Sequence, residues 1–550
     1  MIARALARAV AGERAPRLLA LAAGLAAIPV WIYLTRDRTF AIDEWPFVAD
    51  RWRGGLDTAL ERHNEHIVVI PALIYRLLFE TVGIDQAWPY RLVVLAMHLG
   101  CAAFLFALVR RRAGAWPAAF AAILLLFCAR GSENVLHAFQ MGFVGPVLGG
   151  LAAWWALDRE RPAVACAALV LGVLCGSLAV AIALGVAAEL LWARRARLLW
   201  VPAAPLALYA LWRVGYGPEN ATRREGWEAA PGWAVDAASA AAGGVLGRGL
   251  DYGRPLLLLA IAVVVWRFRA APVTPRLAGV VCAGAAYWLL TGSTRSSGAV
   301  VPQDPDQSRY VYLGVIVVLL VLAECARGWR PGPRGVAALA ALTLLGLLQG
   351  VPELRREAAG WRGASDRVRA EATALHAVRP RVPAGFELAD GLGDISAADY
   401  FRAADRFGSV ALPIEELRRE PAPARHFADR VFVAIDARLV PAGPGEAGAA
   451  GRAPAPVTEA GGGAGMRTRG GCLEVREPVQ VRPASPALLV RGGAAVHVDV
   501  WRIGDDPQAL GDVPARGAAA VRLVPDAIGV PWHVRLTPAG GAPVTVCSLG

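Results

Sequence analysis

Long apolar runs separated by short polar stretches fill the first 350 residues of the chain. Residues 18–34 ("LLALAAGLAAIPVWIYL") and 92–109 ("LVVLAMHLGCAAFLFALV") contain no Asp, Glu, Lys or Arg. A helix of about 20 apolar residues crosses the hydrocarbon core of a bilayer. The pattern therefore predicts an α-helical polytopic membrane domain over residues 1–350, with about 11 spans at 17–34, 89–109, 115–129, 135–157, 162–176, 178–193, 198–215, 254–268, 276–291, 309–327 and 335–350.

One further apolar segment, residues 67–82 ("IVVIPALIYRLLFETV"), differs from the predicted spans. Its apolar run is short, and it contains Pro71, Arg76 and Glu80. This mixture is typical of an amphipathic helix that lies in the membrane interface. The long loop 36–88 is therefore predicted to be external and to carry interfacial helices.

The pattern changes after residue 350. Charges recur at helical spacing over residues 353–378, and short apolar runs then alternate with turns, so we expect a mixed α/β segment at 351–440. Residues 441–471 are rich in Gly, Ala and Pro, which is typical of a flexible linker. Apolar and polar positions alternate in residues 472–550, with turn signals between the runs. This period of two predicts a small β-sandwich.

Composition and charge add the sidedness of the membrane domain. The chain is 56% hydrophobic with a net charge of +12, and its basic residues are all arginine. Arginine clusters follow every second predicted span, as the positive-inside rule expects of cytoplasmic loops: 110–112, 158–161, 194–197, 266–269 and 327–334. This explains the basic charge without a nucleic-acid partner. We expect a bacterial cytoplasmic (inner) membrane protein, its N-terminus cytoplasmic and everything after residue 350 extracytoplasmic.

Cysteine usage predicts one disulfide. Six of the eight cysteines lie in or beside apolar segments, whereas Cys472 and Cys547 bracket the last polar segment. Disulfides persist in extracytoplasmic compartments, which are oxidising. A sheet that returns its last strand beside its first would bring these two residues within bonding distance.

The external loop 36–88 opens with an acid pair, Asp43 and Glu44, beside the end of the first span. Such a pair could hold a divalent cation, supply a general base to a hydroxyl nucleophile, or consist of solvated loop charges. Apolar neighbours, among them Ile42 and Trp45, hold the pair against the interface, where an unused carboxylate is costly. This context favours a function for the pair.

A second cluster in the same loop is "HNEH", residues 63–66. His63 and His66, with Glu65 between them, could ligate zinc or bind the hydroxyls or phosphate of a substrate. The alternative is a helix cap made by Asn64.

The short external loop 130–140 ("RGSENVLHAFQ") contains four polar residues at a spacing of three to four. Glu133, Asn134, His137 and Gln140 would form a polar stripe at the start of a span, where the alternative is a satisfied polar helix end. Glu133 and His137 are taken as candidates for substrate contact.

Arginines also stand at the predicted outer membrane edge, which the positive-inside rule does not explain. Residues 291–312 place Arg295, Arg309 and Tyr310 there, and Arg91 begins the second span. A guanidinium keeps its charge and offers paired donors to a phosphate at headgroup depth. The alternative for each arginine is a side chain that extends to the interface beside aromatic residues.

This layout resembles the GT-C glycosyltransferases, in particular the protein O-mannosyltransferases and the lipid A aminoarabinose transferases, which use lipid-phosphate-linked sugars. The resemblance covers about residues 1–350. The first-loop acidic motif of these families is matched by Asp43-Glu44, the acid of their second external loop by Glu133, and their phosphate-contacting base by Arg91 or Arg309. The usual Lys/Arg-Pro-Pro signature is replaced here by "HNEHIVVIP".

The resemblance implies a GT-C-like fold and inverting transfer of a sugar from a polyprenyl-phosphate donor to an extracytoplasmic glycan, lipid or protein acceptor. Asp43 would act as general base, and Glu44 would orient the acceptor or a divalent cation, the one cofactor considered. Glu133 and the HNEH cluster would line the sugar pocket.

Other functions stay open. An O-antigen-ligase-like polymerase would depend on external arginines rather than on the acid pair. A lipid or small-molecule transporter would carry charges in mid-span and internal repeats, whereas the acids here lie at span ends and no repeat is found. A non-catalytic assembly protein is the remaining alternative.

Overall fold

The computed structural model describes residues 12–217, 224–296, 302–388, 392, 395–446, 456–460, 467–469, 471–525 and 528–549. The chain divides into two compact units. The helical unit comprises Met1–Asp37, Asp50–Val82 and Ala87–Trp361, and the C-terminal unit comprises Arg38–Ala49, Gly83–Gln86 and Arg362–Gly550. The predicted loop 36–88 is thus shared between the two units, which the sequence did not indicate.

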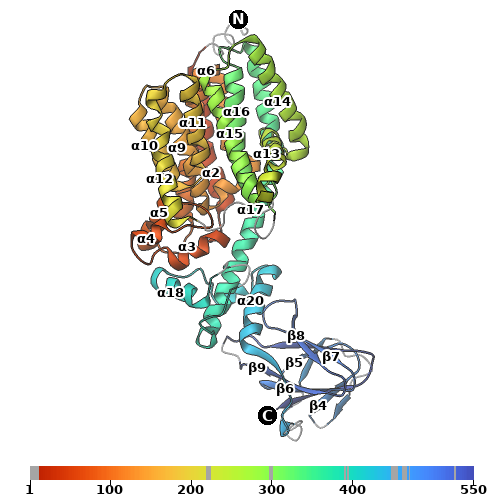
Figure 1. Ribbon diagram of the computed structural model, residues 1–550. Helices are drawn as coiled ribbons and strands as arrows, with labels where there is room; N and C mark the ends of the chain where they lie inside the picture. Colours follow the sequence, from red (N-terminus) through yellow and green to blue (C-terminus); the bar gives the residue numbers. More distant parts are fainter. Residues whose placement is uncertain are drawn as a thin grey trace. The chain divides into compact units, whose positions relative to one another are not determined.

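The helical unit consists mainly of long helices that lie roughly side by side (Figure 1). In chain order they are α2 (Arg14–Thr35), α4 (Leu56–Leu60), α5 (Val69–Thr81), α6 (Trp88–Ala113), α7 (Ala115–Leu126), α8 (Glu133–Leu136), α9 (Met141–Leu157), α10 (Pro162–Cys175), α11 (Ala179–Trp192), α12 (Trp200–Tyr216), α13 (Arg224–Gly244), α14 (Leu250–Ala270), α15 (Pro275–Arg295), α16 (Ser308–Cys325) and the first part of α17 (Pro333–Val378).

Five of these helices are long and apolar enough to cross a membrane: α2, α6, α15, α16 and α17. Three more, α7, α10 and α11, are apolar but shorter. The chain is therefore an integral membrane protein of mainly helical structure, and a helix lies at each of the eleven predicted spans. Helix α5 has 13 residues, fewer than the ~20 needed to cross a bilayer.

Helix α13 is not predicted by the sequence analysis. Its first turn carries Glu225, and Pro231 and several glycines follow, so the region looks like part of a polar loop. Its second half is rich in alanine, and those small side chains are buried. Close packing against neighbouring helices stabilises α13 without an apolar run of the kind that marks a span.

Helix α7 ends early, and its free end is satisfied by side chains. A helix end leaves its last carbonyls without intrahelical partners. The Leu126 carbonyl accepts hydrogen bonds from Trp31 Nε1 at 2.9 Å and from His98 Nε2 at 3.2 Å. His98 Nδ1 in turn accepts from the Tyr312 hydroxyl at 2.8 Å. The chain continues after α7 through residues 127–140 as short helical turns, one of which is α8.

A buried network of charges joins one end of five helices. Arg112 donates to Glu324 (2.7 Å) and Asp158 (2.9 Å), and Arg276 donates to Asp158 (3.1 Å) and Glu189 (2.6 Å). Buried charges are tolerated when they are paired in this way. The network places the C-terminal ends of α6, α9, α11 and α16 beside the N-terminal end of α15.

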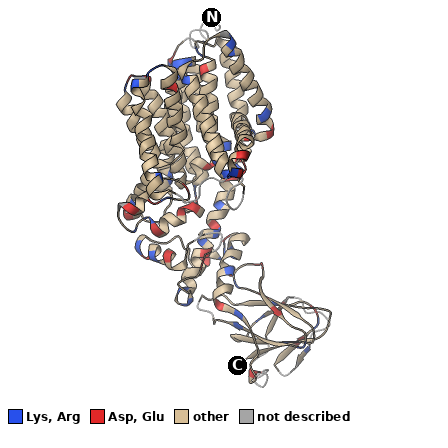
Figure 2. Cartoon of the chain, in the orientation of Figure 1, with Lys and Arg blue, Asp and Glu red and all other residues tan. Residues whose placement is uncertain are grey.

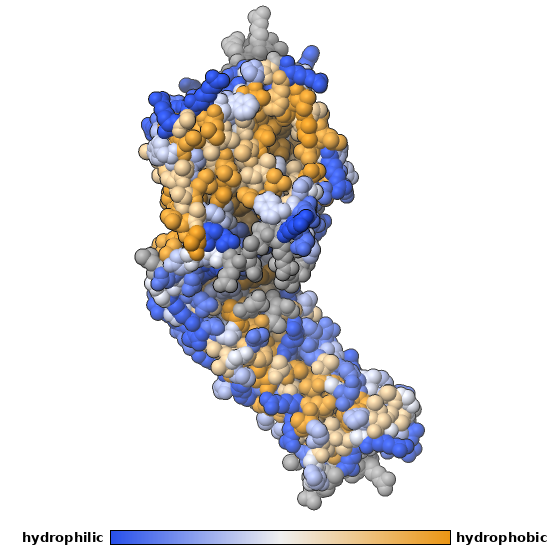
Figure 3. Space-filling view, viewed as in Figure 1, coloured by the Kyte–Doolittle hydropathy of each residue, from blue (hydrophilic) through white to orange (hydrophobic). Residues whose placement is uncertain are grey.

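Charged residues of the helical unit gather near the ends of its helices (Figure 2). Apolar side chains cover most of the visible face between these ends (Figure 3). Leu18, Leu25, Leu258 and Leu348 are each more than half exposed. A face of this kind fits contact with lipid acyl chains.

The C-terminal unit combines helices with two antiparallel sheets (Figure 1). Its helices are the 3-10 helix η1 (Ile42–Glu44), α3 (Trp45–Asp50), the rest of α17, α18 (Ala397–Phe407), α19 (Ile414–Leu417) and α20 (Ala422–Asp436). One sheet has six strands in the order β1-β9-β6-β11-β4-β3, and the other has five in the order β2-β5-β10-β7-β8.

The strands are β1 (Ala437–Pro441), β2 (Val457–Ala460), β3 (Arg467–Arg469), β4 (Cys472–Val475), β5 (Val479–Arg482), β6 (Ala487–Gly492), β7 (Val496–Trp501), β8 (Gln508–Val513), β9 (Ala518–Leu523), β10 (His533–Pro538) and β11 (Val544–Leu549). In β7, buried Val496, Val498 and Val500 alternate with less buried residues. The alternation along residues 472–550 therefore predicts strands β4 to β11 correctly, whereas β1, β2 and β3 lie before this segment.

The segment 441–471, expected to be a flexible linker, contains two strands. β2 pairs with β5 and β3 pairs with β4. Backbone pairing to an existing sheet edge orders these short strands despite their Gly- and Ala-rich surroundings. The rest of that prediction, at 447–455, 461–466 and 470, lies outside the described residues.

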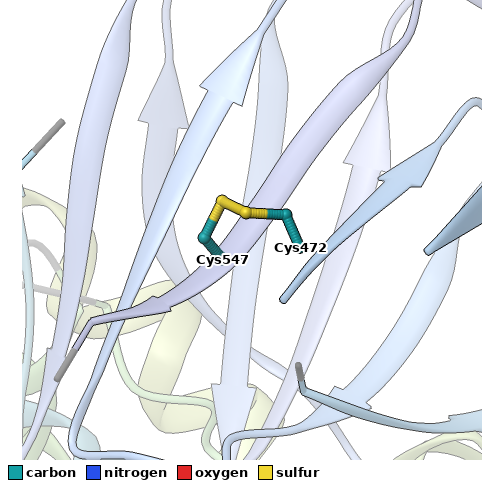
Figure 4. Close-up of a disulfide and its surroundings, with 2 residues drawn as sticks. All are labelled: Cys472 and Cys547. Atoms are coloured by element: carbon teal, nitrogen blue, oxygen red, sulfur yellow. A yellow bond between two sulfur atoms is a disulfide. The ribbon is translucent and has the colours of Figure 1, made fainter. Parts of the chain in front are cut away.

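The expected disulfide is present, and it joins Cys472 of β4 to Cys547 of β11 (Figure 4). The two residues lie directly opposite each other in the antiparallel pair, with a Cα–Cα distance of 4.2 Å. The six other cysteines are free thiols in the helical unit. The bond closes a separation of 75 residues.

Replacing Cys472 and Cys547 together with serine should lower the free energy of unfolding of the C-terminal unit by about 4 kcal/mol, because a long closed loop restricts the unfolded chain. Thermal unfolding of the purified protein checks this value. The matched control is Cys325→Ser, which removes a free thiol and should change little. Two free thiols at these positions in protein from an oxidising compartment would contradict the bond.

Candidate functional site

Two arginines shape the first loop of the helical unit. Arg51 donates to the carbonyls of Thr58 and Arg62, both at 2.6 Å. Arg76, on α5, donates to the carbonyls of Gly55 at 3.0 Å and Arg53 at 3.1 Å. These bonds close the loop on itself around the short helix α4. Arg76, which argued against a membrane span, serves here to anchor the loop to α5.

The HNEH cluster forms a tight turn. His63 and His66 exchange two backbone hydrogen bonds, both 3.0 Å long. Asn64 adopts a positive φ of 52°, a conformation that asparagine tolerates better than most residues. Asn64 is therefore a turn residue and not a helix cap.

The two imidazoles of this turn pack into the helical unit. The His63 ring lies 4.7 Å from the Phe139 ring, and His66 Nδ1 makes a hydrogen bond with Ser177 Oγ. Burial lowers the pKa of His63 to about 3 and that of His66 to about 4, helped by Arg51 and Arg295 respectively. Both rings are neutral at pH 7, so they suit hydrogen bonding to hydroxyls better than attraction of a phosphate.

These shifts predict acid sensitivity. The pKa of each histidine is lower in the folded than in the unfolded protein, where it is about 6.5. The unfolded chain then binds more protons between about pH 4 and 6.5, so stability falls as the pH falls through this window. We expect a loss of about 1.4 kcal/mol per pH unit for each imidazole.

Thermal unfolding of the detergent-purified protein at pH 7.5, 6.0 and 5.0 measures this loss. His66→Gln should reduce the slope. The control is His497→Gln, because Asp512 raises the pKa of this exposed histidine and its titration has the opposite sign. An unchanged slope in His66→Gln would contradict the prediction.

Two ion pairs gather near this turn, at the predicted outer ends of α15 and α16. Arg295 Nη2 lies 3.2 Å from Glu65 Oε2, and Arg309 Nε lies 3.6 Å from Glu133 Oε1. Gln140 Nε2 donates to the same Glu133 oxygen at 3.2 Å. Residues from the first loop, the second loop and two helix ends thus meet in one polar cluster.

Hydrogen bonds between backbone and side-chain groups fix this cluster. The Glu133 amide donates to Ser308 Oγ at 3.0 Å, and the Asn134 side chain donates to the carbonyls of Ser308 (3.2 Å) and Arg309 (3.3 Å). These bonds tie the second loop to the start of α16. Asn134 is therefore a structural residue of the stripe, while Glu133 turns its carboxylate to Arg309.

Tyr310 lies next to Arg309, whose guanidinium is 5.8 Å from the centre of the Tyr310 ring. Its hydroxyl is within electrostatic range of Arg295, Arg309, Glu133 and Glu65. That hydroxyl makes a hydrogen bond with Gln303 Oε1. The Tyr310 ring contacts Trp233 at 5.4 Å, and the Trp233 indole donates to the Gln303 carbonyl at 2.9 Å. The cluster holds two positive and two negative side chains.

The cluster differs from the buried network at the opposite helix ends. The side chain of Arg309 is 31% exposed and that of Arg295 is 21% exposed, whereas Arg112 is 7% exposed. The Arg309 pair is also longer than the Arg112–Glu324 pair, which is 2.7 Å. Partly exposed, loosely paired arginines can exchange a carboxylate for another anion at low cost.

Two predicted contact residues are not part of this cluster. Arg91 is 6% exposed and donates to the Thr35 carbonyl at 3.2 Å, so it joins the end of α2 to the start of α6. The His137 ring is buried against the Trp361 ring, 3.8 Å away. Both side chains are buried in contacts between helices, and their contact with a substrate stays a prediction.

The acid pair belongs to the C-terminal unit. Glu44 is 2% exposed, and its carboxylate accepts the Ala41 amide at 2.9 Å. Asp43 is half-buried on the short helix η1. Ile42, just before it, has a φ of 40°, which is an outlier for a β-branched residue. Strain of this kind is found preferentially at functional sites.

Metal ligation by Asp43 and Glu44, or by His63 and His66, stays a prediction. Among the residues that the structure describes, no group of three or more His, Cys, Asp or Glu side chains is arranged to hold a metal ion. One Glu44 oxygen accepts a hydrogen bond from a backbone amide.

Sequence reasoning missed Ser177 and Gln303 as members of the cluster. Ser177 follows Gly176 at the break between two short apolar helices, and this Gly-Ser interruption is the signal that could have marked it. Gln303 stands in a polar loop with many similar residues, so no pattern singles it out.

Comparison with known proteins gives one structural similarity. No protein-family model matches the sequence, and no curated protein matches it. Among solved structures, the chain is similar to the arabinosyltransferase EmbB from Mycobacterium smegmatis, determined by cryo-electron microscopy. The alignment covers 96% of this chain and 64% of that chain, with 11% sequence identity and a TM-score of 0.33.

Proposed function

We propose that the chain is a GT-C-type membrane glycosyltransferase that transfers a sugar from a polyprenyl-phosphate donor to an extracytoplasmic acceptor. The observation that carries the proposal is the cluster in which Arg295 and Arg309, both partly exposed, meet Glu65 and Glu133. Guanidinium groups bind phosphate oxygens through charge-assisted hydrogen bonds. Glycan, lipid and protein acceptors are all compatible with this proposal.

The donor phosphate would take the place of a carboxylate on the arginines. Arg309 is the first candidate, because its pair with Glu133 is long and its side chain is the more exposed. Arg295 would provide a second guanidinium. Once released, Glu133 would accept hydrogen bonds from sugar hydroxyls together with Gln140 and the neutral His66.

The chemical step would be an inverting displacement at the anomeric carbon. The Asp43 carboxylate takes the proton of the acceptor hydroxyl while the acceptor oxygen bonds to this carbon. The bond from carbon to the phosphate oxygen breaks, and polyprenyl phosphate leaves with the electron pair. The arginines would stabilise the negative charge that develops on this leaving group.

An O-antigen-ligase-like polymerase is the second candidate. Its support is that the external arginines, Arg295 and Arg309, form a cluster by themselves within the helical unit. In that case Asp43 would be dispensable.

The test is transfer of labelled sugar from polyprenyl-phosphate donors in proteoliposomes. We expect transfer with wild type and loss with Arg309→Ala. Transfer that persists in Asp43→Asn but is lost in Arg309→Ala would favour the polymerase. Absence of transfer from every polyprenyl-phosphate sugar tested would contradict the glycosyltransferase proposal.

Helix contacts support the proposal of eleven spans, while the arginine clusters support a cytoplasmic N-terminus. The Arg91–Thr35 bond joins the end of α2 to the start of α6, so α5 between them does not cross. The Arg276–Asp158 pair puts the start of α15 beside the end of α9. An even number of crossings must therefore separate these two ends. Helices α10, α11, α12 and α14 already supply four crossings, so α13 adds none to the predicted eleven.

Cysteine labelling tests this topology in the bacterial inner membrane. Single cysteines at Ala87 and Gly443 should react with a membrane-impermeant reagent in intact cells. A cysteine at Ala113, at the opposite end of α6, should react only after permeabilisation. Labelling of position 113 together with protection of position 443 would reverse the proposed orientation.

A further inference from the structure

The segment that carries the acid pair is held by residues more than 300 positions away in sequence. Arg38–Ala49 groups with Arg362–Gly550 rather than with the rest of its loop. The Thr39 amide donates to Ser365 Oγ at 3.2 Å, and Ser365 is 1% exposed. This bond fixes the backbone four residues before Asp43 to helix α17.

An aromatic contact fixes the other side of the acid pair. The Trp45 and Tyr400 rings lie edge to face with 5.9 Å between centroids, and both side chains are fully buried. The Phe40 ring also contacts the Trp45 ring, with 6.0 Å between centroids. Edge-to-face pairs of this kind stabilise a packed arrangement beyond the burial of area. Trp45 is thus locked two residues after Asp43.

Tyr400 is itself held by a triangle of hydrogen bonds. Its hydroxyl lies 2.9 Å from Ser409 Oγ and 3.2 Å from His376 Nε2, and Ser409 Oγ lies 3.0 Å from the same nitrogen. The three residues come from α17, α18 and the loop after α18. The ring that supports Trp45 is therefore fixed in position and rotation.

A second part of the first loop, at Ile84, contacts helix α18. The Ile84 amide donates to the Phe407 carbonyl at 2.9 Å. Gly83 has a φ of 80°, and a Cβ there would lie 2.4 Å from that carbonyl oxygen. Only glycine allows this approach. The loop thus contacts α18 at two places, through Trp45 and through Ile84. These residues stand before and after the segment Asp50–Val82, which belongs to the helical unit.

We propose that residues 362–412 of the C-terminal unit position the acid pair, with Tyr400 as the principal positioning residue. The inference rests on the proposed function, because it assigns a role to Asp43 in transfer. Ile42 has an unfavourable backbone conformation, which persists only if its surroundings hold it. The bond to Ser365 and the contact with Tyr400 provide that support, one on each side of Ile42 and Asp43.

The experiment combines amide hydrogen exchange with kinetics on the full-length protein in proteoliposomes. Tyr400→Leu should raise the exchange rate of the segment 39–45 at least tenfold. It should also lower kcat about tenfold with little change in KM for the donor, since the proposed phosphate residues lie in the helical unit. Tyr400→Phe keeps the ring and should restore most of both values.

The matched control is Phe432→Leu, which also removes a fully buried aromatic ring from the C-terminal unit but lies on α20. It should leave exchange of segment 39–45 and kcat unchanged. Unchanged exchange in Tyr400→Leu would overturn the inference, as would faster exchange without any change in turnover. If wild type transfers no sugar, the proposed function fails. Faster exchange of segment 39–45 in Tyr400→Leu would then still show that Tyr400 holds this segment in place.

Discussion

Arg309→Ala should lower kcat/KM for a polyprenyl-phosphate sugar by at least ~10²-fold, the largest effect that we expect from one side chain. A hydrogen bond to a charged group contributes about 1.5–3 kcal/mol, and a guanidinium can make two to one phosphate. The side chain is partly exposed, so its removal should change stability by no more than about 1 kcal/mol. Initial rates in proteoliposomes measure the effect.

Three variants make this result specific. Arg309→Lys should recover part of the activity, because an ammonium keeps the charge but loses the paired donors. Arg356→Ala removes another arginine that is paired with a glutamate, at 72% exposure, and should be inert. Arg112→Ala should instead destabilise the protein by about 3–5 kcal/mol, because it leaves buried carboxylates without their partner. Normal donor use by Arg309→Ala would remove the phosphate site from the proposal.

The second large effect is expected at Asp43. Asp43→Asn keeps the size of the side chain and removes the base, so turnover should fall by at least ~10² while the donor still binds. Glu44→Gln should cost less in turnover, because a glutamine oxygen can still accept the Ala41 amide. Single-turnover transfer with all three proteins separates the chemical step from donor binding.

A control in the same short helix distinguishes catalysis from folding. Ile42→Gly should relieve the positive φ and stabilise the backbone locally, yet leave the carboxylate in place. If Asp43 were only a loop charge, its replacement by asparagine would change stability by around 1 kcal/mol and activity hardly at all. Near-normal turnover in Asp43→Asn would therefore transfer the catalytic role to the arginine cluster.

The sequence predicted most helices and strands because their signals are local. The apolar run 18–34 reflects contact with lipid along a whole helix. The alternation in 496–501 reflects a sheet with one buried face. The disulfide also followed from local reasoning, since Cys472 and Cys547 frame the strands that pair. Helix α13 lacked such a signal, because alanine packing and not hydropathy stabilises it.

The candidate site was only partly predictable, for a different reason. The structure brings Glu65, Glu133, Arg309 and Tyr310 together. The sequence marked all four because they stand in predicted external loops or at span ends, and their contact with a substrate stays a prediction. The burial of Arg91 beside the end of α2 could not be predicted, because its neighbours along the chain do not show this contact. The contact of Trp45 with Tyr400 joins residues 355 positions apart, and no pattern along the chain can indicate it.

The strand order of the six-stranded sheet constrains how the protein is made. β11 lies between β6 and β4, although both of these are synthesised before it. If this unit is exported, as proposed, β4 and β6 wait with unpaired edges until residues 544–549 have crossed the membrane. The Cys472 thiol then stays unpaired over the same interval, which covers 75 residues. Extracytoplasmic chaperones and thiol oxidases would act on this open sheet, so the yield of folded protein should depend on them more than on the helices that precede it.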